Sequence, residues 1–406
     1  MKNLLNIFKK SSFGPILFIL FYFLTPYFFI LIFNIVFISA FVTYILIFLS
    51  LILISEFAFN IIYKQINSQS YSKIDKIPFK NITVEPHPNL PFVHKKNFKS
   101  EVKAHKLNFP LHKKIFSAPE LETNNFGYCN GTKGDRDMLV PKKNIFRINC
   151  LGASTTQYYL EDKNGVHSYP LELEKILKEK FPNKNLEVNN CGTGGYVSSD
   201  LLVRFLLQIL ETDPDIVIFY HGYNDIRSYL TDDFAEDYSH SRKNLGETYH
   251  KFYLGSLIPY IPLNFVNYLQ SQWLPQNHRY SLIDSISHGK FNFENQKNLS
   301  KGLESYKRNI QSLITICKAK NIKIILCSFC FYLHKFVKDE KLHHLYKDIV
   351  NKENAIIKEL ANYNNVDYID INNLIEKNDK NFVDTIHFTP DGMKKFALEL
   401  SKFIKL

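Results

Sequence analysis

Two patterns of hydrophobic positions divide the chain. From residue 13 to 63 apolar residues run almost without interruption. From residue 145 onward, short apolar runs alternate with longer segments whose apolar residues recur at helical spacing. A short apolar run predicts a buried strand, and helical spacing predicts an amphipathic helix. The chain therefore consists of an apolar N-terminal segment and a larger α/β domain.

The apolar N-terminal segment is too long for a single membrane helix. A helix over residues 13–63 would be roughly 75 Å long, against a hydrocarbon core of about 30 Å. We therefore expect two transmembrane helices, at about residues 15–33 and 35–55, with a turn near Asn34. A cleaved signal peptide is disfavoured by the length and by the lack of a small-residue cleavage site. A soluble hairpin is disfavoured because neither face is polar.

The excess positive charge lies next to this apolar segment. The chain has a formal net charge of +11, and the residues up to Lys114 contain fourteen lysines against four acidic residues. Such a segment suits anionic lipid head groups, whereas the nearly neutral remainder excludes nucleic acid as a partner. Lysines flank both ends of the predicted hairpin, so the positive-inside rule places both ends in the cytoplasm. If only one segment spans the membrane, the large domain lies outside.

Residues 64–144 are polar and basic without a regular period, which predicts an extended connector and entry segment. The α/β domain then occupies residues 145–406, with an insertion at about 227–296 that breaks the alternation. Strands separated by single helices predict a three-layer α/β/α sandwich around a parallel sheet. We expect strands at 145–151, 186–191, 215–220, 322–328 and 366–371. Helices are expected at 169–181, 198–210 (capped by Ser198 or Ser199), 299–320, 344–363 and from Thr389-Pro390 onward.

Four loops of this domain carry candidate chemistry. They are Gly152-Ala-Ser154, Asn190 to Gly195 (N-C-G-T-G-G), His221 to Asp225 (H-G-Y-N-D) and Asp384-Thr-Ile-His387. The first three follow strands, and the fourth precedes the last helix. Because parallel strands end on the same side of a sheet, these loops can meet there.

Each loop also has an ordinary structural interpretation. Ser154 could be a turn residue or a helix cap, and Gly194-Gly195 a flexible turn. Asn224-Asp225 could form a turn with side-chain hydrogen bonds, and Asp384 and His387 a surface pair. Four such loops in this order favour a catalytic site over coincidence.

The residue types predict nucleophilic catalysis without a metal or cofactor. A serine hydroxyl needs a base to take its proton, and His387 is the candidate base for Ser154. Asp384, three residues earlier, can accept from the other ring nitrogen. The six cysteines show no framework spacing, and Cys327-x-x-Cys330 has no second pair of ligands for zinc.

In these four blocks the chain resembles the SGNH (GDSL-type) hydrolase superfamily. The likeness covers residues 145–406 apart from the insertion, with Ala153 in place of the Asp that precedes the serine in name-giving members. The resemblance implies a flavodoxin-like sandwich and a triad of Ser154, Asp384 and His387. It also implies an oxyanion hole formed by the N–H groups of Ser154 and Gly195 and the side-chain amide of Asn224.

Together these observations predict a membrane-anchored serine esterase that hydrolyses an acyl or acetyl ester of a carbohydrate or a lipid. An O-acyltransferase with the same acyl-enzyme is the alternative, favoured if the insertion is a lid that excludes water. A non-catalytic scaffold protein of the same fold is disfavoured because every triad and oxyanion-hole residue is present. The fold does not select the substrate or the length of the acyl chain.

Overall fold

The computed structural model describes residues 24–25, 42–54, 58, 84–85, 87, 89–99, 105–107, 116–118, 122–129, 137–231, 234–240, 296–334 and 340–405. The chain divides into two compact units. The smaller unit comprises Met1–Pro78 and Ser256–Arg279, and the larger comprises Phe79–Gly255 and Tyr280–Leu406.

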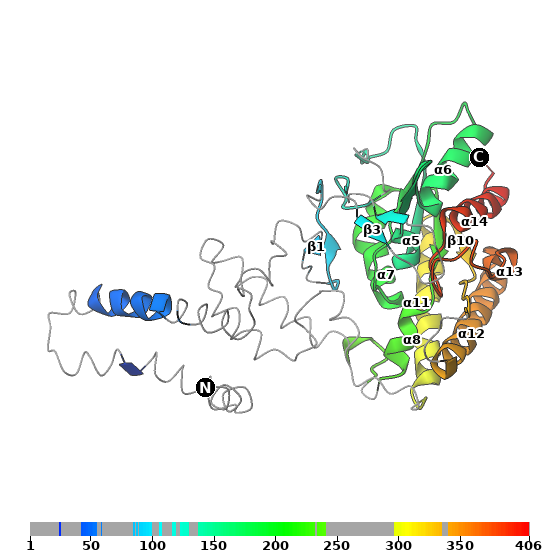
Figure 1. Ribbon diagram of the computed structural model, residues 1–406. Helices are drawn as coiled ribbons and strands as arrows, with labels where there is room; N and C mark the ends of the chain where they lie inside the picture. The colour runs from blue at the N-terminus through cyan, green and yellow to red at the C-terminus, as the bar shows by residue number, and fades with distance from the viewer. Residues whose placement is uncertain are drawn as a thin grey trace. The chain divides into compact units, whose positions relative to one another are not determined.

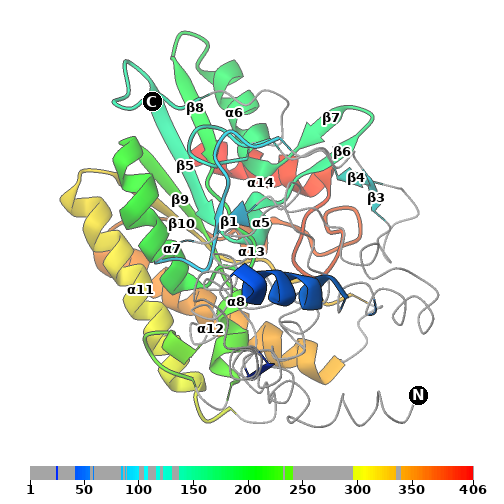
Figure 2. The same ribbon diagram turned by 90° about the vertical axis from the view of Figure 1, so that its left-hand side faces the viewer.

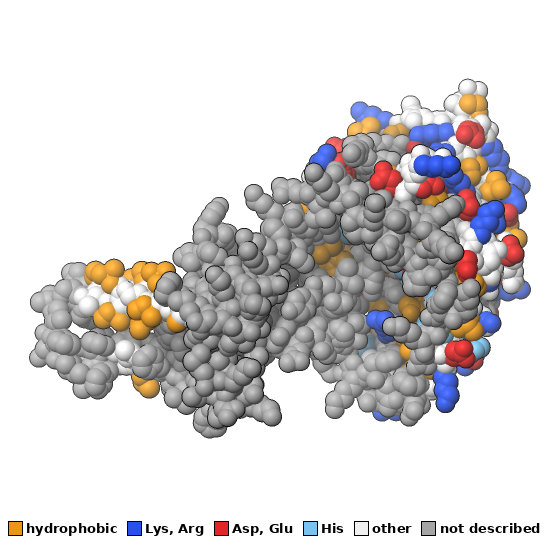
Figure 3. Space-filling model, in the orientation of Figure 1, with side chains coloured by type: hydrophobic (Ala, Val, Ile, Leu, Met, Phe, Trp, Pro, Cys, Tyr) orange, Lys and Arg blue, Asp and Glu red, His pale blue; other side chains and the backbone are white. Residues whose placement is uncertain are grey.

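In the smaller unit, residues 42–54 form a helix. Several of its apolar side chains are exposed, among them Leu46, Leu49 and Leu53, and they form a mostly hydrophobic surface in Figure 3. Across the described ranges, no helix is both long enough and apolar enough to cross a membrane. Most of the predicted hairpin (15–33 and 35–55) lies outside these ranges, so the structure does not support the two predicted transmembrane helices.

The larger unit is built on a five-stranded parallel sheet with the order β11-β10-β9-β5-β8. Its strands are largely buried because both faces of the sheet are covered. Strand β9 is a continuous apolar run, whereas β5 and β8 also contain buried polar residues. The five predicted strands are confirmed with slightly different bounds. They are β5 (Phe146–Gly152), β8 (Leu186–Asn190), β9 (Ile216–Tyr220), β10 (Lys323–Cys327) and β11 (Asp367–Ile369).

Helices cover both faces of this sheet and complete the predicted three-layer sandwich (Figure 1 and Figure 2). On one face α6 (Tyr169–Lys180) packs against α14 (Pro390–Phe403). On the other face α11 (Leu299–Ala319) packs between α7 (Ser198–Arg204) and α12 (Glu340–Asn364). The chain passes from β5 to β8 on one side of it and then back to β9 on the other side. Because of this reversal, right-handed crossovers place α6 and α7 on opposite faces of the sheet.

The helix ends follow local sequence signals, with one exception. Thr389 caps α14 as predicted, because its hydroxyl accepts a hydrogen bond from the Gly392 N–H at 3.1 Å. The predicted single helix at 198–210 is α7 only to Arg204, followed by a π-turn at Phe205–Ile209 and a 3₁₀ turn at Leu210–Thr212. Neither predicted serine caps α7, since its N-cap position is Val197.

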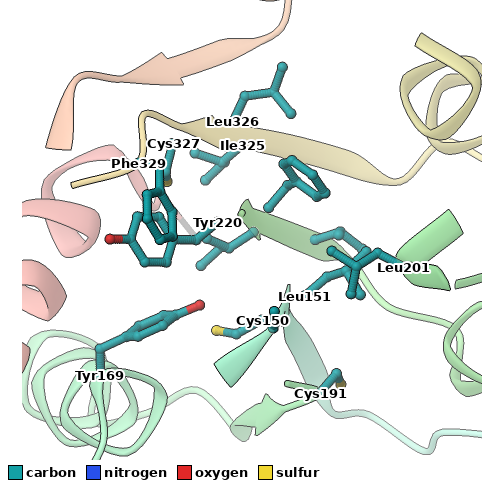
Figure 4. Close-up of a cluster of buried hydrophobic side chains, with 14 of the residues drawn as sticks. Cys150, Leu151, Tyr169, Cys191, Leu201, Tyr220, Ile325, Leu326, Cys327 and Phe329 are labelled. Atoms are coloured by element: carbon teal, nitrogen blue, oxygen red, sulfur yellow. The ribbon is translucent and has the colours of Figure 1, made fainter. Parts of the chain in front are cut away.

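The core between the sheet and its helices contains aromatic rings and cysteines as well as aliphatic side chains. Tyr220 stacks on Phe329 with ring centroids 5.0 Å apart, and Tyr169 lies edge-on to Tyr220 at 6.1 Å. Cys150, Cys191 and Cys327 lie among these side chains (Figure 4). All six cysteines are buried, and burial raises the pKa of the Cys330 thiol to about 11. They act as small apolar core residues.

The predicted connector contains more structure than its sequence indicates. Val84–Glu85 (β1) pairs antiparallel with Val93–His94 (β2). A four-stranded antiparallel sheet has the order β3-β4-β6-β7, and its strands are His105–Leu107, Phe116–Ala118, Leu160–Asp162 and Gly165–His167. These strands have only two or three residues, which is too few to show an alternating pattern.

The predicted insertion at 227–296 begins inside a helix of the domain. Helix α8 covers Asn224–Tyr229, and Tyr238 beyond it is fully buried. Residues 241–295, which make up most of the insertion, lie outside the described ranges. On the face drawn in Figure 3, basic and acidic side chains of the larger unit are interspersed.

Candidate active site

Ser154 lies at the carboxyl end of the central strand β5 and is the first residue of the short helix α5 (Ser154–Gln157). The turn depends on Gly152, because a Cβ at this position would overlap the carbonyl oxygen of Tyr220 on the neighbouring strand. Ser154 is partly exposed, whereas Ala153 and Thr155 on either side are buried. The fold therefore leaves the Ser154 side chain accessible, whereas its neighbours in the turn are buried.

His387 and Asp384 meet Ser154 from the loop that precedes α14. The Nε2 atom of His387 lies 3.1 Å from the Ser154 Oγ, and its Nδ1 atom lies 2.8 Å from Asp384 Oδ2. The loop is closed on itself, because the Val383 N–H donates to the His387 carbonyl at 2.9 Å. The result is a continuous Asp-His-Ser chain of hydrogen bonds between residues more than 230 positions apart.

Asp384 is held in its ionised form. Burial raises the pKa of its carboxyl, but His387 and the backbone N–H groups of Ile386 and His387 outweigh that effect, and the pKa lies below its ordinary value. These N–H groups donate to Oδ1 at 2.8 and 2.7 Å. An ionised Asp384 accepts a hydrogen bond from the Nδ1–H group of His387, which leaves Nε2 free to accept from the serine hydroxyl.

Tyr158 restricts the position of the histidine ring. The centroids of the two rings are 4.6 Å apart, and their planes are inclined by 38°. Burial, and then the charge of Asp384, raise the pKa of Tyr158, so its hydroxyl stays neutral at physiological pH. Sequence reasoning did not single out Tyr158, which follows Ser154 by four positions.

The loop after β8 brings Gly195 to the same end of the sheet. The Thr193 N–H donates to the Gly152 carbonyl at 3.1 Å, which fixes the loop beside the Ser154 turn. Gly195 has φ of +80°, a conformation that favours glycine. Within the described part of the chain, its N–H donates to no other group. This N–H remains available to an acceptor.

Asn224 reaches the same loop through its side chain. Its Nδ2 atom donates to the Tyr196 carbonyl at 2.9 Å, across 28 positions in sequence, and the second N–H of the amide remains available. Its backbone N–H donates to the Gly222 carbonyl at 2.8 Å around Tyr223, which has φ of +68°. A γ-turn of this hand is strained in a tyrosine. The side chain of Asn224 is therefore aimed across the site and does not close a local turn.

A buried polar cluster that sequence reasoning missed lies behind Asn224. Asp225 accepts hydrogen bonds from Ser198 Oγ at 2.6 Å, Tyr238 OH at 2.5 Å and His221 Nε2 at 2.6 Å, and also from the Ser198 N–H. None of these four residues is more than 2% exposed. The one signal for it in the sequence is the acidic residue directly after Asn224.

The structure thus brings all five predicted site residues (Ser154, Gly195, Asn224, Asp384 and His387) to the carboxyl end of the sheet. Each of them is partly exposed. Among the described residues, no group of three or more His, Cys, Asp or Glu side chains could hold a metal ion. Nucleophilic attack on a carbonyl needs a serine hydroxyl that is hydrogen-bonded to a base, and N–H donors nearby for the oxyanion. This site contains both.

The three-layer α/β/α fold, with this site at the carboxyl end of its parallel sheet, is typical of acylhydrolases. The model of the GDSL-like lipase/acylhydrolase family matches residues 150–395. The chain belongs to this family and is an ester-hydrolysing enzyme. No curated protein matches the chain.

Solved structures of esterases are among the matches to this chain, at low sequence identity. An acetyl xylan esterase, AlAXEase, is 19% identical, with a TM-score of 0.39, over 64% of this chain and 100% of that one. Axe2, an acetylxylan esterase from Geobacillus stearothermophilus, is 16% identical, with a TM-score of 0.38, over 64% and 94%. A lipase/acylhydrolase from Enterococcus faecalis is 15% identical, with a TM-score of 0.38, over 64% and 95%.

Proposed function

We propose that this protein is a serine esterase that cleaves an acyl or acetyl ester, linked to a carbohydrate or a lipid, through an acyl-enzyme on Ser154. The observation that carries the proposal is the continuous chain of hydrogen bonds from Asp384 through His387 to Ser154, with distances of 2.8 and 3.1 Å. In this arrangement the histidine accepts the serine proton during attack, and the aspartate orients the ring and stabilises its protonated form.

In the acylation step, Ser154 Oγ attacks the ester carbonyl carbon while its proton moves to His387 Nε2. The carbonyl oxygen becomes an oxyanion, which the N–H groups of Ser154 and Gly195 and the Asn224 amide stabilise. Each such donor contributes on the order of 3 kcal/mol to the transition state. The intermediate then collapses, the C–O bond to the alcohol breaks, and the departing oxygen takes the proton from Nε2.

In the second step a water molecule attacks the acyl-enzyme. Its proton moves to His387 Nε2, and the new tetrahedral intermediate uses the same oxyanion donors. When the bond to Ser154 Oγ breaks, the histidine returns its proton to the serine and the acid leaves. The enzyme is regenerated with one ester and one water converted to an acid and an alcohol.

A fluorophosphonate probe and a set of esters test this function. Ser154 should be labelled in the full-length protein and unlabelled in Ser154→Ala. Short and long acyl p-nitrophenyl esters and acetylated sugars should identify the preferred acyl group, with the released acid as the product. Labelling at another residue, or turnover by Ser154→Ala, would contradict the proposal. Acylation of an added sugar acceptor in place of acid release would establish the transferase alternative.

We also propose that the N-terminal apolar segment associates with a lipid bilayer. The exposed apolar side chains of the 42–54 helix and the flanking lysines support this proposal. By the lysine distribution the catalytic domain would face the cytoplasm. The full-length protein should stay in the membrane fraction after alkaline carbonate washing, and a reporter fused after Lys80 should behave as cytoplasmic. Release by carbonate would overturn the membrane proposal, and an external reporter signal would overturn the assigned side.

A further inference from the structure

Residues 92–94, which belong to the connector and entry segment (64–144), contact the loop that carries Gly195. This segment precedes the family match at 150–395. Phe92 and His94 are nevertheless buried, at 1% and 6% exposure. Two separate contacts join them to the 193–196 loop, one through Gln157 and one through Tyr196.

Gln157 forms the first contact. It lies three positions after Ser154, at the end of the helix that the serine begins. Its Oε1 atom accepts a hydrogen bond from the Gly194 N–H at 2.5 Å. Two consecutive glycines leave the backbone unusually free, so bonds at either side decide where the Gly195 N–H points. The bond to Gln157 fixes the side that precedes Gly195.

His94 fixes the orientation of the Gln157 amide. The Nε2 atoms of the two side chains are 3.1 Å apart. Because the amide oxygen already accepts from Gly194, the amide NH₂ group faces His94 and donates to the ring nitrogen. A flipped amide would place NH₂ against the Gly194 N–H, donor against donor. His94 therefore stabilises the one orientation that accepts from the loop.

Tyr196 fixes the other side of the loop. Its hydroxyl donates to the Phe92 carbonyl, and its ring lies edge-on to the Phe92 ring, with centroids 5.6 Å apart. The Tyr196 carbonyl in turn accepts from the Asn224 amide at 2.9 Å. Residues 92–94 thus support both sides of Gly195, and through Tyr196 they also support Asn224.

We propose that His94 and Gln157 are positioning residues that act in series to align the Gly195 N–H for the oxyanion. This inference rests on the proposed function, in which Gly195 is an oxyanion donor. It assigns a role in catalysis to a segment outside the matched family region. The role is indirect, because His94 acts through Gln157.

The test uses His94→Leu, Gln157→Leu and the double variant in the full-length protein, with kcat, KM and Tm measured on one ester. Each single variant should lower kcat by about 10- to 100-fold with little change in KM, the effect expected of a misaligned catalytic group. The double variant should be no worse than the poorer single variant, since the two residues act in series. His94→Gln, whose amide oxygen can accept from Gln157, should recover most of the turnover.

His240→Leu is the matched control. His240 is also 6% exposed, and its ring likewise accepts a hydrogen bond, in this case from the Ala235 backbone N–H at 3.1 Å. This variant should lower Tm and leave kcat per folded molecule unchanged. If His94→Leu does not fold, Gln157→Leu decides, because its side chain is partly exposed.

Three results would overturn the inference alone. The first is unchanged kcat in folded Gln157→Leu, and the second is losses in the single variants that multiply in the double variant. The third is a His94→Gln variant as slow as His94→Leu, which would show that size or packing, and not the acceptor, matters at this position. Failure of the proposed function has a different signature, which is turnover by Ser154→Ala.

Discussion

Two sets of serine, histidine and aspartate side chains lie close together in the larger unit. In the first, His387 lies between Ser154 and Asp384. In the second, Asp225 lies between Ser198 and His221, at 2.6 Å from each. The first set is partly exposed, whereas His221 and Asp225 of the second are 0% exposed.

The comparison illustrates that residue type alone does not determine what such a set can do. The order of its hydrogen bonds and its exposure to substrate matter as well. In the exposed set the histidine can accept the serine proton and return it to a leaving group. In the buried set both partners donate to the carboxylate, and no substrate can reach Ser198. The buried aspartate is stabilised by several donors, which offset the cost of burying its charge.

The buried set connects the loops that carry the other two site residues, Gly195 and Asn224. Asp225 directly follows Asn224, and its partner Ser198 begins α7 just after the loop that carries Gly195. Their hydrogen bonds connect the N-termini of α7 and α8, and so hold the two loops at a fixed separation. Asp225 therefore has a structural role, which is to join the helices that follow these two loops.

The largest expected difference between the two sets lies in their serines. Ser154→Ala should lower kcat by about 10⁴-fold or more, and adding His387→Ala should change little, because the two act as one unit. Ser198→Ala should stay within a few-fold of wild-type kcat and lose on the order of 1–3 kcal/mol of unfolding free energy. Steady-state kinetics and urea denaturation measure both. Equal catalytic losses in the two variants would remove the distinction.

The neighbours Asn224 and Asp225 should separate catalysis from stability in the same way. Asn224→Asp replaces a donor by a carboxylate facing the developing oxyanion and the Tyr196 carbonyl, so kcat should fall by about 10²-fold or more. Asp225→Ala leaves several buried donors without an acceptor and should cost roughly 3 kcal/mol of stability. The measurements are kcat and Tm on one ester. Normal turnover in Asn224→Asp would exclude Asn224 from the site.

A smaller effect is expected at Gly195. Alanine at a φ of +80° is strained by about 1–2 kcal/mol, and relief of that strain would rotate the N–H away from the site. Gly195→Ala should therefore lower kcat by roughly 10-fold. Gly165→Ala is the matched control, since Gly165 has φ of +110° in the β6–β7 hairpin, away from the site residues. It should lower Tm only, and a similar kcat loss in both variants would contradict the role of Gly195.

The smallest effect concerns Glu353, which accepts from the Tyr229 hydroxyl at 3.2 Å and the Tyr223 N–H at 3.4 Å behind the strained turn. Burial, and then the charge of Asp225, raise the pKa of Glu353 well above its ordinary value. Because the folded state favours protonated Glu353, this residue contributes its full stabilisation below the unfolded-state pKa near 4.5. That contribution is lost as the pH rises through the higher pKa of the folded state.

Glu353→Gln mimics the protonated acid at every pH and keeps an acceptor oxygen. Its Tm should match that of the wild type near pH 4 and exceed it toward pH 8, by on the order of 2–4 °C. Thermal unfolding across this pH range measures the difference. A Tm difference that does not change with pH would show that Glu353 does not titrate in the folded protein as inferred.

The sequence by itself determined the elements of the sheet domain and the five residues of the proposed site. Apolar runs such as Ile216–Tyr220 must be buried on both faces, and Thr389-Pro390 starts a helix through its own local bonds. Ser154, Gly195, Asn224, Asp384 and His387 were identified because parallel strands end on one side of a sheet and because the four blocks resemble a known superfamily. These signals are local, so they can be recognised without knowing what packs against them.

Only the tertiary structure decided what supports those residues. His94 meets Gln157 across 63 positions, and Ser198 meets Asp225 across 27. The pattern of hydrophobic and polar residues around these positions does not indicate which residues are partners. The same limit applies to short strands such as Val93–His94, which lie in the predicted connector. Two residues show no alternating pattern, and their pairing depends on the part of the domain against which they pack. Contacts between distant segments are selected by packing and by the need to satisfy buried polar groups, which act on the folded chain as a whole.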